Sequence, residues 1–302
     1  MAYSGDTRRL HDNIYVRSLI GALRRIVSQP RTLIPFLWIL LVLFLAVFGP
    51  YLIPYKYDET MYDDQGAIMI AEGPSLEHPL GTTSEGYDVM SRMIYGARPT
   101  AITGVLGGFL IVGIGLSVAL TAGFVGGRVD DLLMRITDVF YAIPLIPFAI
   151  VVLAFLGGGF FVSILIIGFL LWRGNARVIR SQVLQIRERP YVLAAKATGA
   201  STPRIIAKHI FPNIAPMAAL FFAFGIGIAI IAQAGLAFIG VANPFQPSWG
   251  VVVRNAYNSG YMADQLAWSL TPGFLIAFTV MSVYMIGREF EEREGSSAGA
   301  VA

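Results

Sequence analysis

Few side chains in this sequence of 302 residues are suited to covalent or metal chemistry. There is no cysteine, which excludes a disulfide framework, a thiolate zinc site and a cysteine nucleophile. The three histidines, His11, His78 and His209, lie far apart in sequence and do not indicate a histidine-rich metal site. We therefore expect neither a metal nor a cofactor on this chain.

Five long apolar stretches contain no Asp, Glu, Lys or Arg. An intramembrane hydrolase would need a base beside its nucleophile, and these stretches offer Ser and Thr but no plausible base. A proton-coupled carrier would also need ionisable groups there, because such groups are costly in a membrane and are kept for a purpose. The stretches are residues 32–55, 99–127, 139–172, 210–253 and 265–287.

The nearest ionisable side chains are Arg135 and Asp138, at one end of the third stretch. Their spacing predicts an interfacial ion pair on a helix, with a role in gating or partner contact as the alternative. Pro144 and Pro147 indicate either ordinary helix geometry or a bend that shapes a pathway. His78 precedes Pro79, which favours a role in loop packing over metal binding.

The most informative polar segment runs from residue 173 to residue 208, with eight basic residues and only Glu188 acidic. Residues 191–198 are good helix formers, and Gly199 follows them at a natural C-cap. We expect a short surface helix that carries Ala194 and Ala195. Small side chains before a helix stop are what a protruding helix needs to fit into a partner's cleft.

The elements that position these residues must be membrane helices. The composition is 56% hydrophobic and 14% charged, against about 45–50% and about 25% in soluble domains. A span needs about 20 apolar residues, and the third stretch is too long for one helix and is cut by three glycines at 157–159. We predict an all-α protein with six spans, near residues 33–53, 101–124, 132–156, 160–179, 214–240 and 267–287.

Charge in the loops supports six spans rather than five. Six Arg stand before the first span against two Asp, and the segment 56–98 has three basic residues against eight acidic ones. Lys and Arg accumulate on the cytoplasmic side of short loops. With six spans both basic segments face the cytoplasm and the acidic one faces out, so we place both termini in the cytoplasm.

These assignments divide the chain into a cytoplasmic N-terminal segment (1–31), a first span (32–55), an extracytoplasmic loop (56–98), a five-helix core (99–288) and a frayed cytoplasmic tail (289–302). The basic start is similar to a cleavable signal, but the apolar run exceeds the usual length of about 7–15 residues. We interpret it as an uncleaved first span. The net charge is only +3, and we expect no nucleic-acid partner.

The basic segment resembles the EAA signature of the permease subunits of bacterial and archaeal ABC importers. The resemblance rests on the pattern Ala-Ala-x3-Gly-x12-Pro, which is formed by Ala194, Ala195, Gly199 and Pro212. The sequence departs from the signature at three positions, where it has Leu193, His209 and Phe211. Tyr191 lies in the same matching segment.

Further motifs resemble the oligopeptide/dipeptide/nickel class of these permeases, and together they cover roughly residues 75–290. Residues 78–82 with 95–98 are similar to the outer-loop signature of that class, whereas residues 84–87 depart from it. Residues 234–240 and 247–250 are similar to a second signature, and Trp268, Pro272 and Gly287 to the last span. The motif positions are His78, Gly81, Arg98, Gly235, Gly240, Trp249 and Gly250.

This resemblance implies a type I ABC importer permease fold in the cell membrane of a prokaryote. It implies a core domain at 99–288 with a coupling loop at 180–213, where Tyr191, Ala194, Ala195, Gly199 and Pro212 contact the ATPase. The implied partners are a second homologous permease, two cytoplasmic ATPase subunits and an extracytoplasmic binding protein. The chain has no G-x-x-x-x-G-K-[ST] phosphate loop, which is consistent with ATP hydrolysis on the ATPase subunits and not on this chain.

The resemblance does not identify the ligand. Relatives of this class carry di- and oligopeptides, nickel chelates or oligosaccharides, and we expect peptides. A secondary carrier or channel is the alternative from another class, and it would transport without ATPase partners.

Overall fold

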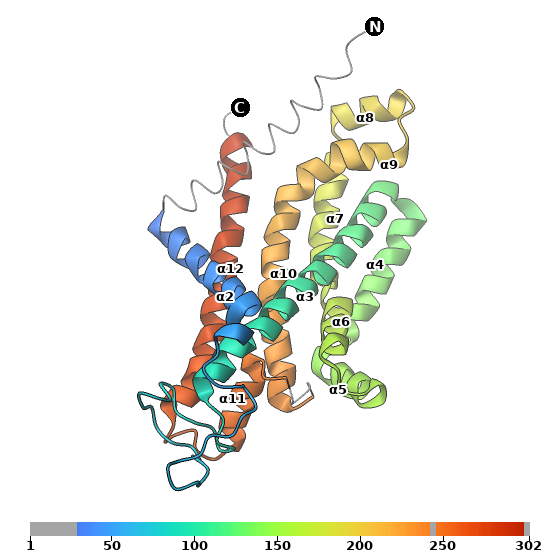
Figure 1. Ribbon diagram of the computed structural model, residues 1–302. Coiled ribbons are helices and arrows are strands. Elements are labelled where there is room, and N and C mark those ends of the chain that lie inside the picture. The colour runs from blue at the N-terminus through green and yellow to red at the C-terminus, as the bar shows by residue number, and fades with distance from the viewer. Residues whose placement is uncertain (1–28, 242–245, 299–302) are drawn as a thin grey trace.

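The structure is a computed structural model that describes residues 29–241 and 246–298, with side chains up to residue 289. Those residues form helices and no strand, apart from isolated bridges in the loop between the first two helices. The helices form an elongated bundle, with this loop at one end and the short helix α8 (Pro190–Ala197) at the other (Figure 1). The predicted all-α class is confirmed.

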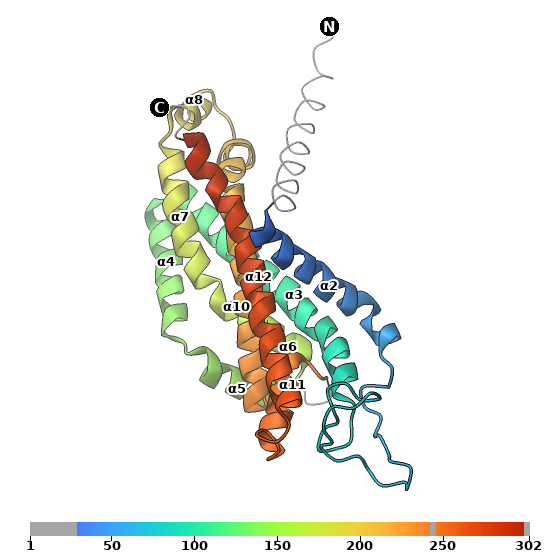
Figure 2. The ribbon, with the colours of Figure 1, turned by 90° about the vertical axis from the view of Figure 1, so that its left-hand side faces the viewer.

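Four helices of the described chain are long and apolar enough to cross a membrane. They are α2 (Pro30–Leu52), α3 (Val89–Val125), α10 (Phe211–Ile239), which is extended at its start by shorter helices, and α12 (Leu266–Ala298). Figure 2 shows α12 running along the bundle, with α2 and α3 to one side of it.

Two bent helix pairs are further candidate spans. Helix α4 (Gly127–Ala142) meets α5 (Leu145–Leu156) at 85°, and α6 (Phe160–Leu171) meets α7 (Arg173–Arg187) at 41°. Counting each pair as one span gives six. The glycines at 157–159 separate α5 from α6, as the sequence predicts.

The spans predicted near 132–156 and 160–179 are therefore bent and not straight. Pro144 has no N–H, and its ring disfavours helical geometry at the residue before it. Ile143 is accordingly extended, with φ −83° and ψ 114°. The structure shows a bend at Pro144, and its role in shaping a pathway stays a prediction.

Helix α3 begins at Val89, well before the predicted start at 101, so the preceding loop covers residues 53–88 and not 56–98. Asp88 caps the helix, because its side chain accepts a hydrogen bond from the Ser91 backbone N–H at 2.7 Å. With 37 residues, α3 is about 55 Å long and exceeds the roughly 30 Å of membrane hydrocarbon. Arg92 and Arg98 interrupt the charge-free stretch, which is why the sequence placed the start too late.

Two other boundaries differ from the sequence prediction. The predicted frayed tail from residue 289 is helical as far as Ala298, as part of α12. Helix α11 (Trp249–Asn258) lies where no element was predicted. It is hidden in the apolar pattern of its neighbours, and its start is marked only by Ser248, whose hydroxyl accepts a hydrogen bond from the Val251 N–H at 3.4 Å.

The centre of the bundle is the contact between α3 and α10, which depends on small residues. A methyl group added at Gly107 would lie 2.6 Å from Cβ of Ala229, and one added at Gly225 would lie 3.2 Å from Cα of Gly108. Close backbone approach through small residues is the usual means of helix association in lipid. Gly107, Gly108 and Gly225 therefore pack within the chain.

The fold makes a topological prediction that uses the absence of native cysteine. Glu72 lies in the 53–88 loop and Ser201 beside α8, at opposite ends of the molecule, and both are exposed. Cysteines introduced by Glu72→Cys and Ser201→Cys should react with a membrane-impermeant maleimide from opposite sides of the membrane, with Ser201→Cys reacting from the cytoplasm. Solubilised membranes serve as the control for reactivity, and labelling of both cysteines from one side would contradict six spans.

Candidate functional site

The candidate site is the terminal segment, residues 188–212, at the end of the bundle opposite the 53–88 loop. It consists of α8, the single turn α9 (Thr202–Ile205), the π-helical turn η1 (Ile206–Ile210) and the start of α10. Pro190 stands in the first turn of α8, where its fixed φ and missing N–H cost nothing. The predicted surface helix is therefore present.

One side chain anchors α8 to the bundle. Val192 is fully buried, in a cluster that includes Phe124 at the end of α3 and Ile205 of α9. On the other face Tyr191 and Leu193 are 45% and 46% exposed. An apolar side chain that is half exposed at the tip of a bundle is available to a partner.

Gly199 ends α8 as the sequence predicts. Its φ is +77°, a backbone angle that residues with a side chain rarely adopt. The N–H of Gly199 donates to the carbonyl oxygen of Lys196 at 3.0 Å, and the N–H of Ala200 donates to that of Ala195 at 3.1 Å. These two bonds form a Schellman motif, so the chain turns away immediately after the helix.

The two alanines of the signature have different surroundings. Ala194 is exposed, whereas Ala195 is half buried against the cluster around Val192. The small size of Ala195 therefore serves packing within this chain, which the sequence did not reveal. Pro212 lies apart from both, in the first turn of α10, where its missing N–H needs no partner.

Two cationic side chains, one immediately before the terminal segment and one within it, contact the end of α3. Arg187, at the end of α7, donates from Nη1 to the carbonyl oxygen of Gly123 at 3.0 Å. The Lys196 Nζ lies 4.9 Å from the centre of the Phe124 ring. Helix α8 therefore contacts the end of α3 through an apolar side chain, Val192, and a cationic one, Lys196.

The two helix breaks meet at Arg173. Its Nη1 donates to the carbonyl oxygens of Phe140 at 2.7 Å and of Ile143 at 3.4 Å, which lie at the α4–α5 break. Arg173 is itself the first residue of α7, at the other break. One guanidinium group thus binds backbone acceptors at a break where the helical pattern is interrupted.

Asp138 pairs with Arg177 of α7 and not with Arg135, so the predicted pairing was wrong. Tyr141 completes the cluster, because its ring centre lies 4.4 Å from the Arg177 guanidinium and 5.1 Å from that of Arg173. Sequence spacing pointed to a pair within one helix, but α4 packs against α7, where Arg177 lies close to both Asp138 and Tyr141.

At the opposite end, His78 is part of the loop core. It is 3% exposed, and its Nδ1 lies 2.9 Å from Oδ1 of Asp88, the residue that caps α3. Gly81 has φ +79°, and a side chain there would lie 2.3 Å from the carbonyl oxygen of Glu72. This geometry agrees with a packing role for His78. In the described chain no group of three or more His, Cys, Asp or Glu could hold a metal ion.

The motif residues after α10 lie at close contacts between helices. Trp249 is 1% exposed and donates from Nε1 to the carbonyl oxygen of Met93 at 2.9 Å. A methyl group at Gly250 would lie 2.6 Å from Cα of Ala234. Gly240 has φ +92° and ends α10, whereas Gly235 has open space around its Cα.

Comparison with known proteins identifies this architecture. The family described as binding-protein-dependent transport system inner membrane component matches residues 111–290, more than half of the chain. The chain belongs to this family of ABC importer permeases. The matched region contains the terminal segment, both helix breaks and all of α10.

Two relatives cover most of this permease. It is 32% identical over 265 residues to the glutathione transport system permease protein GsiD of Pectobacterium atrosepticum, spanning 87% of this chain and 86% of the relative. It is 35% identical over 258 residues to the dipeptide transport system permease protein DppC of Bacillus subtilis, spanning 83% and 77%. The permease is thus a multi-pass membrane component of a transport system and not itself a catalyst.

The Arg173 contacts generate a stability prediction. Arg173→Leu removes a charged donor and leaves two carbonyl oxygens without it, and a hydrogen bond to a charged group contributes about 1.5–3 kcal/mol. We expect the free energy of unfolding, measured by titrating the permease from mild detergent into dodecyl sulfate, to fall by about 2–4 kcal/mol.

The matched control is Arg135→Leu, because Arg135 is exposed on α4 and makes no hydrogen bond or ion pair with the described residues. That variant should unfold like the unmodified permease. Equal effects of the two substitutions would contradict a specific role of Arg173 at the break.

Proposed function

We propose that this permease is one half of the translocation pathway of an ATP-driven importer for di- and oligopeptides. A second homologous permease forms the other half, and two ATPase subunits dock on the cytoplasmic side. A binding protein delivers the ligand from outside. The relatives named for glutathione and for dipeptides support the peptide class.

The observation that carries the proposal is the exposed face of α8. The helix protrudes from the end of the bundle, and its free face bears Tyr191, Leu193 and Ala194 with no large charged side chain between them. An apolar face with a small residue at its centre fits a cleft in a partner. The Schellman turn at Gly199 keeps the following chain away from that cleft.

The contacts behind α8 provide a route for the ATPase to act on the pathway. Val192 packs α8 against the end of α3, and Arg187 at the end of α7 donates to the same end of α3. Arg180 of α7 forms a two-point ion pair with Asp130 of α4. Helices α3, α4 and α7 are thus linked at the end that α8 occupies.

Alternating access follows from these links. When ATP closes the ATPase dimer, the α8 helices of the two permeases approach each other and the helices attached to them tilt. The pathway then opens on the side of the 53–88 loop. ATP is bound and hydrolysed on the ATPase subunits and not on this chain.

The α8 surface leads to a prediction about docking. Ala194→Trp places bulk on the exposed face without disturbing the cluster around Val192, so the permease should insert at normal levels. Gly199→Asp should act similarly, because a side chain at φ +77° costs about 1 kcal/mol. For both variants we expect ATPase co-purification and transport to fall by about tenfold, as a loss of about 1.4 kcal/mol at the interface would cause.

The control is Ala263→Trp, since Ala263 is an exposed alanine at the opposite end of the molecule. It should co-purify the ATPase normally. Ala195→Trp should instead lower the stability of the permease by about 1–3 kcal/mol, because it overfills a packed contact. Normal co-purification by the Ala194 and Gly199 variants would contradict the assignment of α8 as the docking site.

The ligand class leads to a second test. The permease reconstituted alone should not hydrolyse ATP, whereas the full assembly should do so faster when its binding protein is supplied with dipeptides or glutathione. If only nickel chelates or only oligosaccharides stimulated ATP hydrolysis, those compounds and not peptides would be the transported ligands. Ligand uptake by the permease without ATPase subunits would indicate a secondary carrier or channel.

A further inference from the structure

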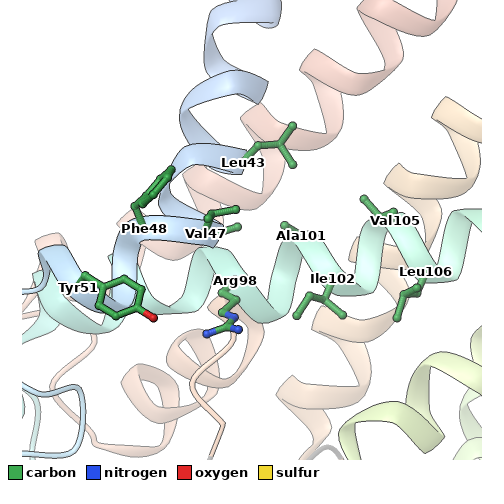
Figure 3. A pocket seen from close by; sticks show the side chains of 10 residues that line it. Leu43, Val47, Phe48, Tyr51, Arg98, Ala101, Ile102, Val105 and Leu106 are labelled. Carbon is green, nitrogen blue, oxygen red and sulfur yellow. The ribbon is translucent and has the colours of Figure 1, made fainter.

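A groove of about 610 Å³ lies between α2 and α3, on the half of the molecule nearer the 53–88 loop (Figure 3). The two helices touch at Gly49, where an added methyl group would lie 3.1 Å from the carbonyl oxygen of Ile94. The groove opens beside this contact. It is lined from α2 by Leu43, Ala46, Val47, Phe48 and Tyr51, and from α3 by Arg98, Ala101, Ile102, Val105 and Leu106.

The lining is apolar except at one end. Figure 3 shows Arg98 and Tyr51 towards the same end, with Ile102, Val105 and Leu106 following along α3. Tyr51 is 85% exposed. Arg98 is also exposed, and it makes no hydrogen bond or ion pair with the described residues.

The depth of Arg98 in the membrane follows from α3 itself. Arg98 lies about 13 Å from the start of the helix and immediately precedes the charge-free stretch that begins at Pro99. Its guanidinium therefore lies at the level where hydrocarbon gives way to polar headgroups. Tyr51 is of the residue type that gathers at this level, because its ring is apolar and its hydroxyl is polar.

An occupant of the groove must match its apolar lining and the one unpaired cation, Arg98, at headgroup depth. A phospholipid has this chemistry, since its phosphodiester accepts hydrogen bonds from a guanidinium and its acyl chain is apolar. Basic pockets between membrane helices bind lipid headgroups for the same reason. An apolar helix of another protein would cover the groove but would leave the charge of Arg98 unpaired.

We propose that the α2–α3 groove is a phospholipid site. The phosphodiester binds the Arg98 guanidinium beside the Tyr51 hydroxyl, and one acyl chain lies along Ile102 and Leu106. The lipid comes from the leaflet on the side of the 53–88 loop. The site lies outside the terminal segment and does not depend on the ligand that the permease transports.

The test uses the full chain in phosphatidylcholine nanodiscs that contain a trace of phosphatidylglycerol with a diazirine on its acyl chain. After irradiation and digestion, the lipid adducts should map to the groove residues of α2 and α3. Arg98→Gln should reduce these adducts about tenfold, as expected for the loss of one charge-assisted hydrogen bond. Arg128→Gln is the control, because Arg128 is an exposed arginine in the first turn of α4, beyond the other end of α3, and the adducts of this variant should be unchanged.

Two further measurements separate a lipid site from other occupants. A diacylglycerol with the same diazirine lacks the phosphodiester, and its adducts should be fewer and insensitive to Arg98→Gln. Ala101→Trp fills the groove and should abolish the adducts of both lipids while the permease melts normally.

The proposal is overturned by any of three results. These are equal phosphatidylglycerol adducts in Arg98→Gln and the unmodified chain, adducts spread evenly over the lipid-facing helices, or loss of the groove adducts in the assembly with the second permease. In the last case, a disulfide between an Ile102→Cys variant and a cysteine introduced into the second permease would show that a protein occupies the groove.

Discussion

The constraint that governs this structure is that membrane hydrocarbon offers no water to a backbone amide or carbonyl group. An unbroken helix meets the constraint by itself, and α3 does so over 37 residues. A broken helix cannot, and this chain has two breaks. The 85° bend at Ile143 and Pro144 is possible because Arg173 donates to carbonyl oxygens at the bend. The charge of Arg173, which would be costly in hydrocarbon, thus lies where it can donate hydrogen bonds to carbonyl oxygens at the break.

The sequence predicted those features that depend on local chemistry. Charge-free length together with loop charge indicated six spans, the glycines at 157–159 indicated a turn, and Gly199 indicated a helix stop. Each follows from a short run of neighbouring residues, because span length, backbone freedom and capping are local properties. The family resemblance rested on equally short motifs.

Features that depend on distant partners could not be predicted. Pro144 indicated a bend, but nothing in the sequence joined it to Arg173, which is far along the chain and on another helix. The half-buried position of Ala195 depends on where Val192 docks in the bundle. The early start of α3 was missed because a search for charge-free runs ends at Arg98, although helices that protrude from a membrane carry charges in their outer turns.

The small-residue contact between α3 and α10 has a mechanical consequence. Gly107, which faces Ala229 across this contact, is the middle residue of α3, with arms of about 27 Å on either side. A stiff rod that is held closest at its midpoint behaves as a balanced lever, and the contact of Gly107 with Ala229 is its fulcrum. A rigid tilt that moves the Phe124 end inward by 1 Å moves the Asp88 end outward by about the same amount. In the proposed alternating access, such a tilt would convert closure on one side of the membrane into opening on the other, with a mechanical advantage close to one.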